Sequence, residues 1–188
     1  KVEPPPVKVA AAALGVPVVQ PASLRDEAAL QTLKNADADF FIVVAFGHLL
    51  RESVLNMPRL GCINVHASLL PHYRGPAPIH WAVINGESES GLTIFWVDEG
   101  IDTGDILLQK KVEIGPNETT GELYFNKLYQ LGVEACLEAV DLVARGMAPR
   151  IPQDHSQGTY DPPCDEKVAG LNLNQPARQV FNFIRGCD

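Results

Sequence analysis

The fold is decided by Phe40-Phe41-Ile42-Val43-Val44-Ala45, an unbroken apolar run, and by Cys62-Ile63-Asn64-Val65-His66, a second such run with polar residues near its carboxyl end. Strands that are apolar on both faces are typical of parallel sheets that helices cover on both sides. We therefore predict that residues 40–45 form a central strand and that residues 62–66 form another strand of the same sheet.

Helices and strands alternate along the rest of the chain. Amphipathic or Ala-rich stretches that end in glycine or begin with a capping residue predict helices, and apolar stretches between them predict strands. The predicted helices are 7–14, 23–34, 77–84, 119–146 (capped by Thr119 or Thr120 and bent near Gly132) and 174–184; the other strands are 16–19, 92–97 and 105–113, and 147–164 is a surface connection. This order predicts an α/β fold with a doubly wound, mostly parallel sheet, which binds ligands at the carboxyl ends of its strands.

The composition excludes several classes of protein. The chain has 15 Lys and Arg against 23 Asp and Glu, and a net charge of -8 argues against broad electrostatic binding to nucleic acid or to an anionic membrane. No apolar run reaches the roughly 18 residues of a membrane span, and the first residues do not resemble a signal peptide. We expect no membrane partner and a cytoplasmic location, or a mitochondrial or plastid matrix. The four cysteines are widely spaced, which indicates reduced thiols.

Two polar side chains stand at the carboxyl end of the second apolar run. Because side chains alternate along a strand, Asn64 and His66 point to the same side, and both should face the ligand cleft. By itself this pair is more simply interpreted as a hydrogen-bonded polar pair at a strand end. The other histidines show no metal-ligand spacing, so no metal is expected.

A second polar stretch, Asp98-Glu99-Gly100-Ile101-Asp102-Thr103-Gly104-Asp105, follows the strand predicted at 92–97. Its two glycines permit a tight backbone turn that returns a carboxylate to the cleft. A plain acidic loop is the simpler interpretation, and a calcium loop is disfavoured because the alternating ligands and terminal Glu of an EF-hand are absent. Taken together, the two stretches predict that an amide, an imidazole and a carboxylate converge.

These residues stand in a longer pattern. Cys62 to Pro71 with Tyr73-Arg74-Gly75, then Gly91-Leu92-Thr93-Ile94 and Asp98 to Leu107, closely resembles methionyl-tRNA formyltransferase and its relatives, the folate-dependent formyltransferases. The resemblance covers nearly the whole chain. It implies a catalytic core at residues 1–146 that lacks an N-terminal βαβ unit, and a linker with a helix at 147–188 that leads to an absent C-terminal β-barrel.

The resemblance also implies roles for the residues. Asn64, His66 and Asp102 match the catalytic residues of the family, and an amide NH2 with an imidazolium would stabilise the oxyanion formed when an amine attacks the formyl carbon. Asp102 would raise the proton affinity of His66. The donor would be 10-formyltetrahydrofolate, bound by Ala45, Phe46, Gly47, Ser68, Leu69, Leu70, Pro71, Val97, Asp98, Glu99, Gly100, Ile101 and Asp102. Arg74 would steer the folate tail or the acceptor, or be solvated.

The formyl acceptor stays open at this point. The first half of the chain favours the methionine of initiator methionyl-tRNA as a partner. The second half, including Leu107-Leu108-Gln109-Lys110 and Ala148 to Gln153, looks closer to the hydrolase domain of 10-formyltetrahydrofolate dehydrogenase, in which water is the acceptor. The pattern also fits a sugar-nucleotide formyltransferase, which formylates an amino sugar, or a silent folate-binding module without turnover. The oligomeric state is not indicated.

Overall fold

A computed structural model describes residues 3–188, which form two compact units that meet in sequence at Ala38 and Asp39. The first unit contains α1 (Pro6–Ala13) and α2 (Glu27–Asn35), as expected from the sequence. Its helix α2 begins later than predicted, because Asp26 and not Ser23 caps it by accepting a hydrogen bond from the Ala28 amide. The strand predicted at 16–19 is wrong: these residues are exposed, and no strand pairs with them in the described chain.

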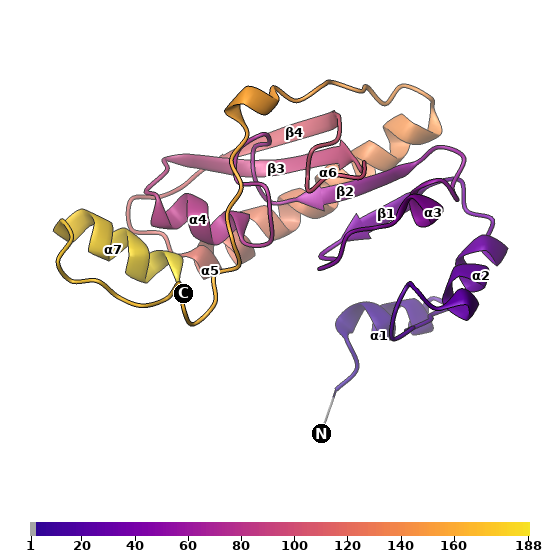
Figure 1. Ribbon diagram of the computed structural model, residues 1–188, viewed down its shortest axis with the longest axis horizontal. Helices are drawn as coiled ribbons and strands as arrows, with labels where there is room; N and C mark the ends of the chain where they lie inside the picture. The colour runs from indigo at the N-terminus through magenta and orange to yellow at the C-terminus, as the bar shows by residue number, and fades with distance from the viewer. Residues whose placement is uncertain (1–2) are drawn as a thin grey trace. The chain divides into compact units, whose positions relative to one another are not determined.

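The second unit is built on one sheet (Figure 1). Its strands are β1 (Phe41–Val44), β2 (Cys62–His66), β3 (Glu89–Trp96) and β4 (Ile106–Glu113), in the order β1-β2-β3-β4. The α/β class is therefore confirmed. The expectation of a mostly parallel sheet is wrong, because β1 and β2 run parallel whereas β3 is antiparallel to both β2 and β4.

The two antiparallel pairings have different origins. Only residues 97–105 join β3 to β4, and this loop is shorter than the dozen or so residues that a parallel crossover needs. Between β2 and β3 lies the helix α4 (Pro78–Ile84), as in a crossover, yet His66 pairs with Thr93 and Ile63 with Trp96. The segment with α4 therefore turns the chain back at the carboxyl end of β2 and does not carry it across the sheet.

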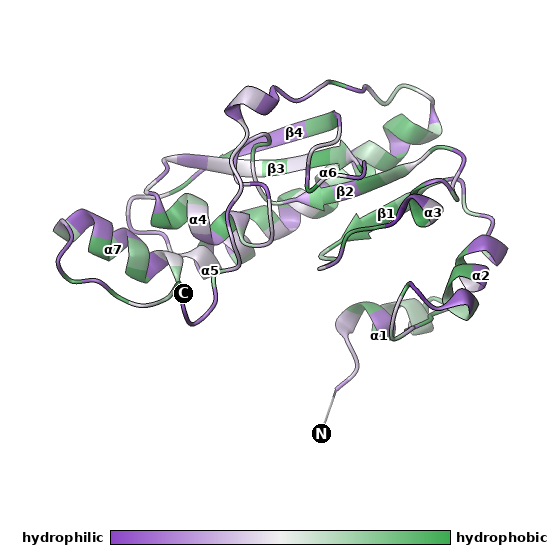
Figure 2. Ribbon diagram, viewed as in Figure 1, coloured by the Kyte–Doolittle hydropathy of each residue, from purple (hydrophilic) through white to green (hydrophobic). Residues whose placement is uncertain are grey.

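The core lies between the sheet and a long helix, α6 (Tyr129–Ala144). Ala135 and Ala139 of this helix are fully buried, and their small side chains let it pack closely on the strands. Figure 2 shows apolar residues, in green, along β2 and α6. The buried side chains on either side of this contact are Ile63, Ile94, Trp96, Leu107, Ala135, Ala139 and Val143.

A second apolar cluster lies where the segment before α6 meets α4 and β3. It consists of Ala82, Val83, Leu92, Ile114, Leu123 and Leu128. The segment starts as α5 (Thr120–Leu123) and widens into the π-helix η1 (Tyr124–Leu128) before α6. Thr119, one of the two predicted capping residues, caps it, but the irregularity lies in η1 and not at Gly132.

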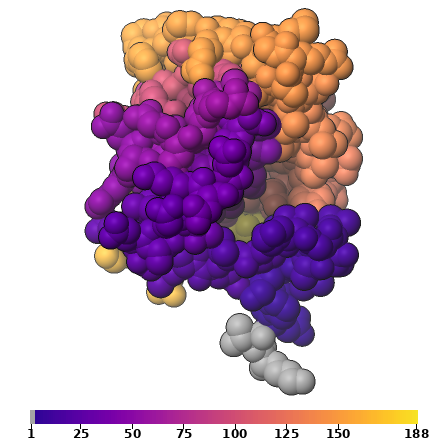
Figure 3. Space-filling view, turned by 90° about the vertical axis from the view of Figure 1, so that its right-hand side faces the viewer, coloured from indigo at the N-terminus to yellow at the C-terminus, as the bar shows by residue number. Residues whose placement is uncertain are grey.

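The remaining elements are short and lie near the surface. α3 (Glu52–Leu55) precedes β2, and the connection after α6 contains the 3-10 turn η2 (His155–Gln157) before α7 (Ala177–Gly186). Figure 3 shows this connection, in orange, as a broad part of the surface. The predicted division into residues 1–146 and 147–188 stays a prediction. No helix of residues 3–188 has the length and apolarity to span a membrane.

Candidate active site

His66 lies at the carboxyl end of β2, on the same face of the sheet as Asn64. The imidazole is almost completely buried, with an edge-to-face contact to the ring of Phe95 at 6.4 Å between ring centroids. Asn64 is half-buried, and Phe95 of β3 is paired with it. The structure therefore places the amide and the imidazole of the predicted site on one surface of the sheet.

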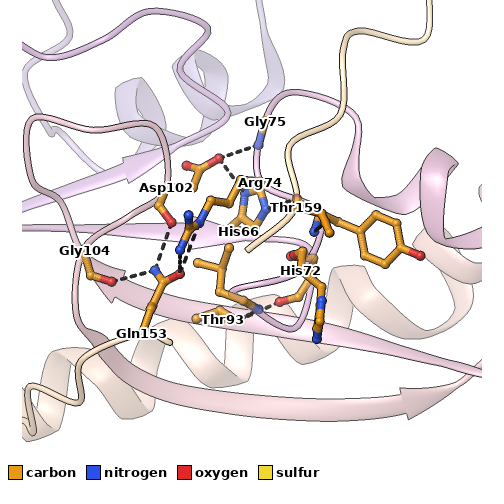
Figure 4. Close-up of polar contacts among 12 residues, drawn as sticks. His66, His72, Arg74, Gly75, Thr93, Asp102, Gly104, Gln153 and Thr159 are labelled. Carbon is orange, nitrogen blue, oxygen red and sulfur yellow. Dashed lines mark hydrogen bonds and ion pairs between the residues drawn. The ribbon is translucent and has the colours of Figure 1, made fainter. Parts of the chain in front are cut away.

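The carboxylate of Asp102 reaches the same place from the loop between β3 and β4 (Figure 4). Its Oδ2 atom lies 3.6 Å from Nδ1 of His66 and accepts a hydrogen bond of 2.8 Å from the amide of Gly75. Asp102 adopts a left-handed backbone conformation with φ of 54°, which is uncommon for a residue other than glycine. The predicted meeting of the imidazole and the carboxylate is thus present in the structure.

The second nitrogen of His66 fixes the position of the ring proton. Nε2 lies 2.8 Å from the carbonyl oxygen of Tyr73, and a carbonyl only accepts hydrogen bonds, so Nε2 carries a proton. Nδ1 is then the atom that gains or loses a proton, and it is also the atom that faces Asp102. Proton transfer at this imidazole would therefore occur next to the carboxylate.

Burial and charge act in opposite directions on His66. Burial lowers the pKa of His66 below its usual value, while the Asp102 carboxylate and the hydrogen bond to Tyr73 counteract this. The sequence predicts a raised proton affinity from Asp102 alone. That contribution exists, but the loss of solvent around the ring outweighs it, and the sequence does not reveal the depth of burial.

The segments predicted to bind the folate differ in exposure. Phe46 and Ile101 are each about 42% exposed, so the loops 45–47 and 97–102 are open to a ligand. Ser68 and Leu70 are buried, and their polar atoms are used within the protein: the Ser68 hydroxyl donates to the His72 carbonyl, and the Leu70 amide donates to Thr93. A role of these two residues in folate binding stays a prediction.

Two contacts at the site were missed from the sequence: the amide of Gly75 and the side chain of Gln153. Gln153 is buried, and its Nε2 donates to the carbonyls of Asp102 at 2.9 Å and Gly104 at 2.7 Å. Arg74 is half-buried, donates to Gln153 and contacts His155, and a role in steering a ligand stays a prediction. Gln153 lies in a polar segment that is typical of a surface connection, and nothing in its spacing marks it.

A cavity of about 400 Å³ lies next to the loop that contacts His66. Tyr73, whose carbonyl binds His66, also lines this cavity, but His66 and Asp102 do not line it. The cavity is therefore distinct from the place where the His66 imidazole and the Asp102 carboxylate meet. The cavity is lined by Leu69, His72, Tyr73, Asn85, Glu87, Glu89, Ser90, Thr159 and Asp161.

Within residues 3–188, no three His, Cys, Asp or Glu side chains are grouped so as to hold a metal ion. The expectation that the reaction uses no metal stays a prediction, as do the catalytic roles of Asn64, His66 and Asp102.

Comparison with known proteins gives one family. The family described as formyl transferase matches residues 1–140. A methionyl-tRNA formyltransferase of Moorella thermoacetica is 45% identical over 99% of this chain and 60% of its own length, and one of Synechococcus sp. (strain JA-2-3B'a(2-13)) is 50% identical over 98% and 58%. The chain thus spans about 60% of the length of these curated relatives.

Solved structures show the same fold. An N-formyltransferase of Helicobacter canadensis, solved with folinic acid and dTDP-3-aminofucose, superposes with a TM-score of 0.74 at 24% identity. The match covers 94% of this chain and 62% of that one. At this identity the likeness concerns the fold, and it agrees with the mixed sheet described above.

Proposed function

The chain belongs to the formyl transferase family, and from this premise we propose that it transfers the formyl group of 10-formyltetrahydrofolate to the amino group of initiator methionyl-tRNA. The names of the relatives at 45% and 50% identity support this acceptor. Because the partner is an initiator tRNA, we place the activity where translation begins, in the cytoplasm or in an organelle matrix. The observation that carries the proposal is the contact of the His66 imidazole with the Asp102 carboxylate, beside Asn64.

The reaction joins an amine nitrogen to the formyl carbon and breaks the bond from that carbon to N10 of the folate. An attacking amine must lose a proton, and the leaving N10 must gain one. The lowered pKa of His66 leaves Nδ1 free of a proton near neutral pH, so it suits a general base that takes the proton from the amine. The imidazolium that results is stabilised by Asp102 and then donates the proton towards N10.

Oxyanion stabilisation is the second task of the site. During attack the formyl oxygen becomes negatively charged, and hydrogen-bond donors fixed in advance around it lower the barrier. The NH2 group of Asn64, on the same face of β2 as His66, provides such a donor. Nδ1 of His66 becomes a second donor once it has taken the proton of the amine, and it remains one until it passes that proton towards N10. The exposed loops 45–47 and 97–102 provide main-chain groups for the pterin, with Phe46 as an apolar wall.

The test is an assay of the full-length protein with 10-formyltetrahydrofolate and charged initiator methionyl-tRNA. We expect formylmethionyl-tRNA to form. We expect Asp102→Asn to lower kcat by about 100-fold or more, because His66 without the carboxylate loses the usual contribution of a positioned acid and base. Asp141→Asn is the control, because Asp141 lies on α6 with an exposed side chain, paired with Arg145. Equal activity of the two variants would contradict the proposed role of Asp102.

The same assay separates the other acceptors. Release of formate without formylated tRNA would identify water as the acceptor, and formylation of an amino-sugar nucleotide would identify the sugar enzymes. If a folate analogue binds by titration calorimetry but none of the three products forms, the protein is a folate-binding module. Each of these results would overturn the tRNA proposal while leaving the family assignment intact.

A further inference from the structure

The side chain of Gln153 is buried and makes four hydrogen bonds. Its Nε2 donates to the carbonyls of Asp102 and Gly104, and its Oε1 accepts from Nη2 of Arg74 at 2.7 Å and from Nε at 3.3 Å. A primary amide has two N–H donors and two acceptor lone pairs, so all of its capacity is used. The amide is therefore held in one orientation, since a flipped amide would place NH2 against the guanidinium and oxygen against two carbonyls.

These contacts act on the backbone that carries the Asp102 carboxylate. The left-handed conformation of Asp102 is uncommon for a residue with a side chain, and such conformations persist when the surroundings fix them. Gln153 binds the carbonyl of Asp102 itself and the carbonyl two residues later, so it holds both sides of this turn. The carboxylate is fixed separately by the amide of Gly75.

We propose that Gln153 is a positioning residue, which sets the distance between the Asp102 carboxylate and Nδ1 of His66 by holding the Asp102 turn against Arg74. Gln153 does not touch His66, and it acts only through Asp102. Figure 4 shows the path from Arg74 through Gln153 to Asp102 and His66. The proposal rests on the proposed function for its catalytic consequence, but the positioning itself does not depend on turnover.

The direct test is the titration of His66 by NMR in the full-length protein. The charge of Asp102 is the larger of the two contributions that oppose burial, so a displaced carboxylate lowers the midpoint of the His66 titration. We expect Gln153→Met, which keeps the length of the side chain but has no N–H donor, to lower the midpoint. The control is Gln157→Met in the same connection, where the side chain is exposed and binds only Asp154, and the midpoint should not change.

A structural role alone gives a different result. If Gln153→Met lowers the midpoint of unfolding but leaves the His66 titration unchanged, the proposal is wrong. If this variant does not fold, Gln153→Asn takes its place: it keeps the amide on a stem one methylene shorter, which cannot reach Arg74 and both carbonyls together. An unchanged titration in that variant would equally contradict the positioning role.

Kinetics give the catalytic consequence. A small displacement of a catalytic group costs up to about 100-fold in rate, so kcat of Gln153→Met should fall by about 10- to 100-fold with little change in the KM for the folate. A rise in KM at constant kcat would show a role in binding and would contradict the proposal. If the wild-type protein forms no product, the proposed function fails, while the NMR titration still decides the role of Gln153.

Discussion

At the scale of single residues, His66 makes stability depend on pH. Its pKa is lowered in the folded protein, first by burial, so the unfolded chain binds this proton more tightly than the folded protein does. Stability then rises with pH over the range in which only the unfolded chain is protonated. Above the unfolded pKa of about 6.5, His66 does not lower the stability of the fold. As the pH falls below that value towards the folded pKa, the stability is progressively lost.

We therefore expect the wild-type protein to lose more stability than His66→Gln between pH 7.5 and pH 5.5. The variant has no group that titrates at this position, so comparison of the two pH values within each protein removes the constant cost of the substitution. Urea denaturation at both pH values measures the difference. An equal loss in both proteins would show that other groups cause the acid sensitivity.

The same residues show what the sequence reveals about the site. The alternation of side chains places Asn64 and His66 on one face of β2, and the glycines of the next loop allow Asp102 to return. The sequence therefore predicts that His66 and Asp102 meet, and the structure places them 3.6 Å apart. Gln153 was not predictable, because its position depends on how the segment after α6 folds back. Patterns within a strand or helix report local geometry, whereas contacts between distant loops depend on packing that no local pattern records.

At the scale of elements, the positions of the strands were predicted better than their directions. Residues 62–66 form β2 as predicted, and β4 begins one residue later than predicted. The antiparallel direction of β4 could be predicted from the sequence, because the loop 97–105 is too short for a parallel crossover. The direction of β3 was not, because a helix between two strands occurs both in crossovers and in connections that turn back.

The start of α5 is an element boundary that can be tested. The Thr119 hydroxyl accepts from the Glu122 amide, and the Glu122 carboxylate accepts from the Thr119 amide, so two N–H groups that lack partners in the helix are satisfied. We expect Thr119→Ala to lower the free energy of unfolding by about 1 kcal/mol, as measured by urea denaturation. Thr119→Ser keeps the hydroxyl and should stay close to wild type; if it is as unstable as the alanine variant, the cap is not the cause.

At the scale of the whole molecule, hydrogen bonds between segments far apart in sequence hold the second unit together. The Thr159 hydroxyl binds the amide of Tyr73, and Gln153 binds Asp102, so the connection after α6 completes the surroundings of the site. The same connection continues to α7, where the Thr120 hydroxyl donates to the Gly186 carbonyl. Residues 147–188 therefore share a compact unit with the sheet, and the composition of this segment does not indicate that.

Arg185 anchors α7 to the rest of this unit. Its side chain is buried, and Nη1 donates to the carbonyls of Glu118 at 2.7 Å and Gly115 at 3.3 Å, while Nε donates to Asn182. Arg185→Met fills similar space but leaves these acceptors without their donor. An unpaired buried polar group costs about 1–3 kcal/mol, so we expect a loss of stability in that range.

Arg178→Met is the matched control for this prediction. Arg178 lies on the same helix and donates to the carbonyl of Pro116, but it is exposed, so water replaces the lost hydrogen bond. Such surface substitutions usually change stability by less than about 0.5 kcal/mol. Urea denaturation of both variants measures the difference. If the two variants lose equal stability, the buried guanidinium does not anchor α7. The close packing of α7 on α4, where Gly186 approaches Ile84, then holds the helix instead.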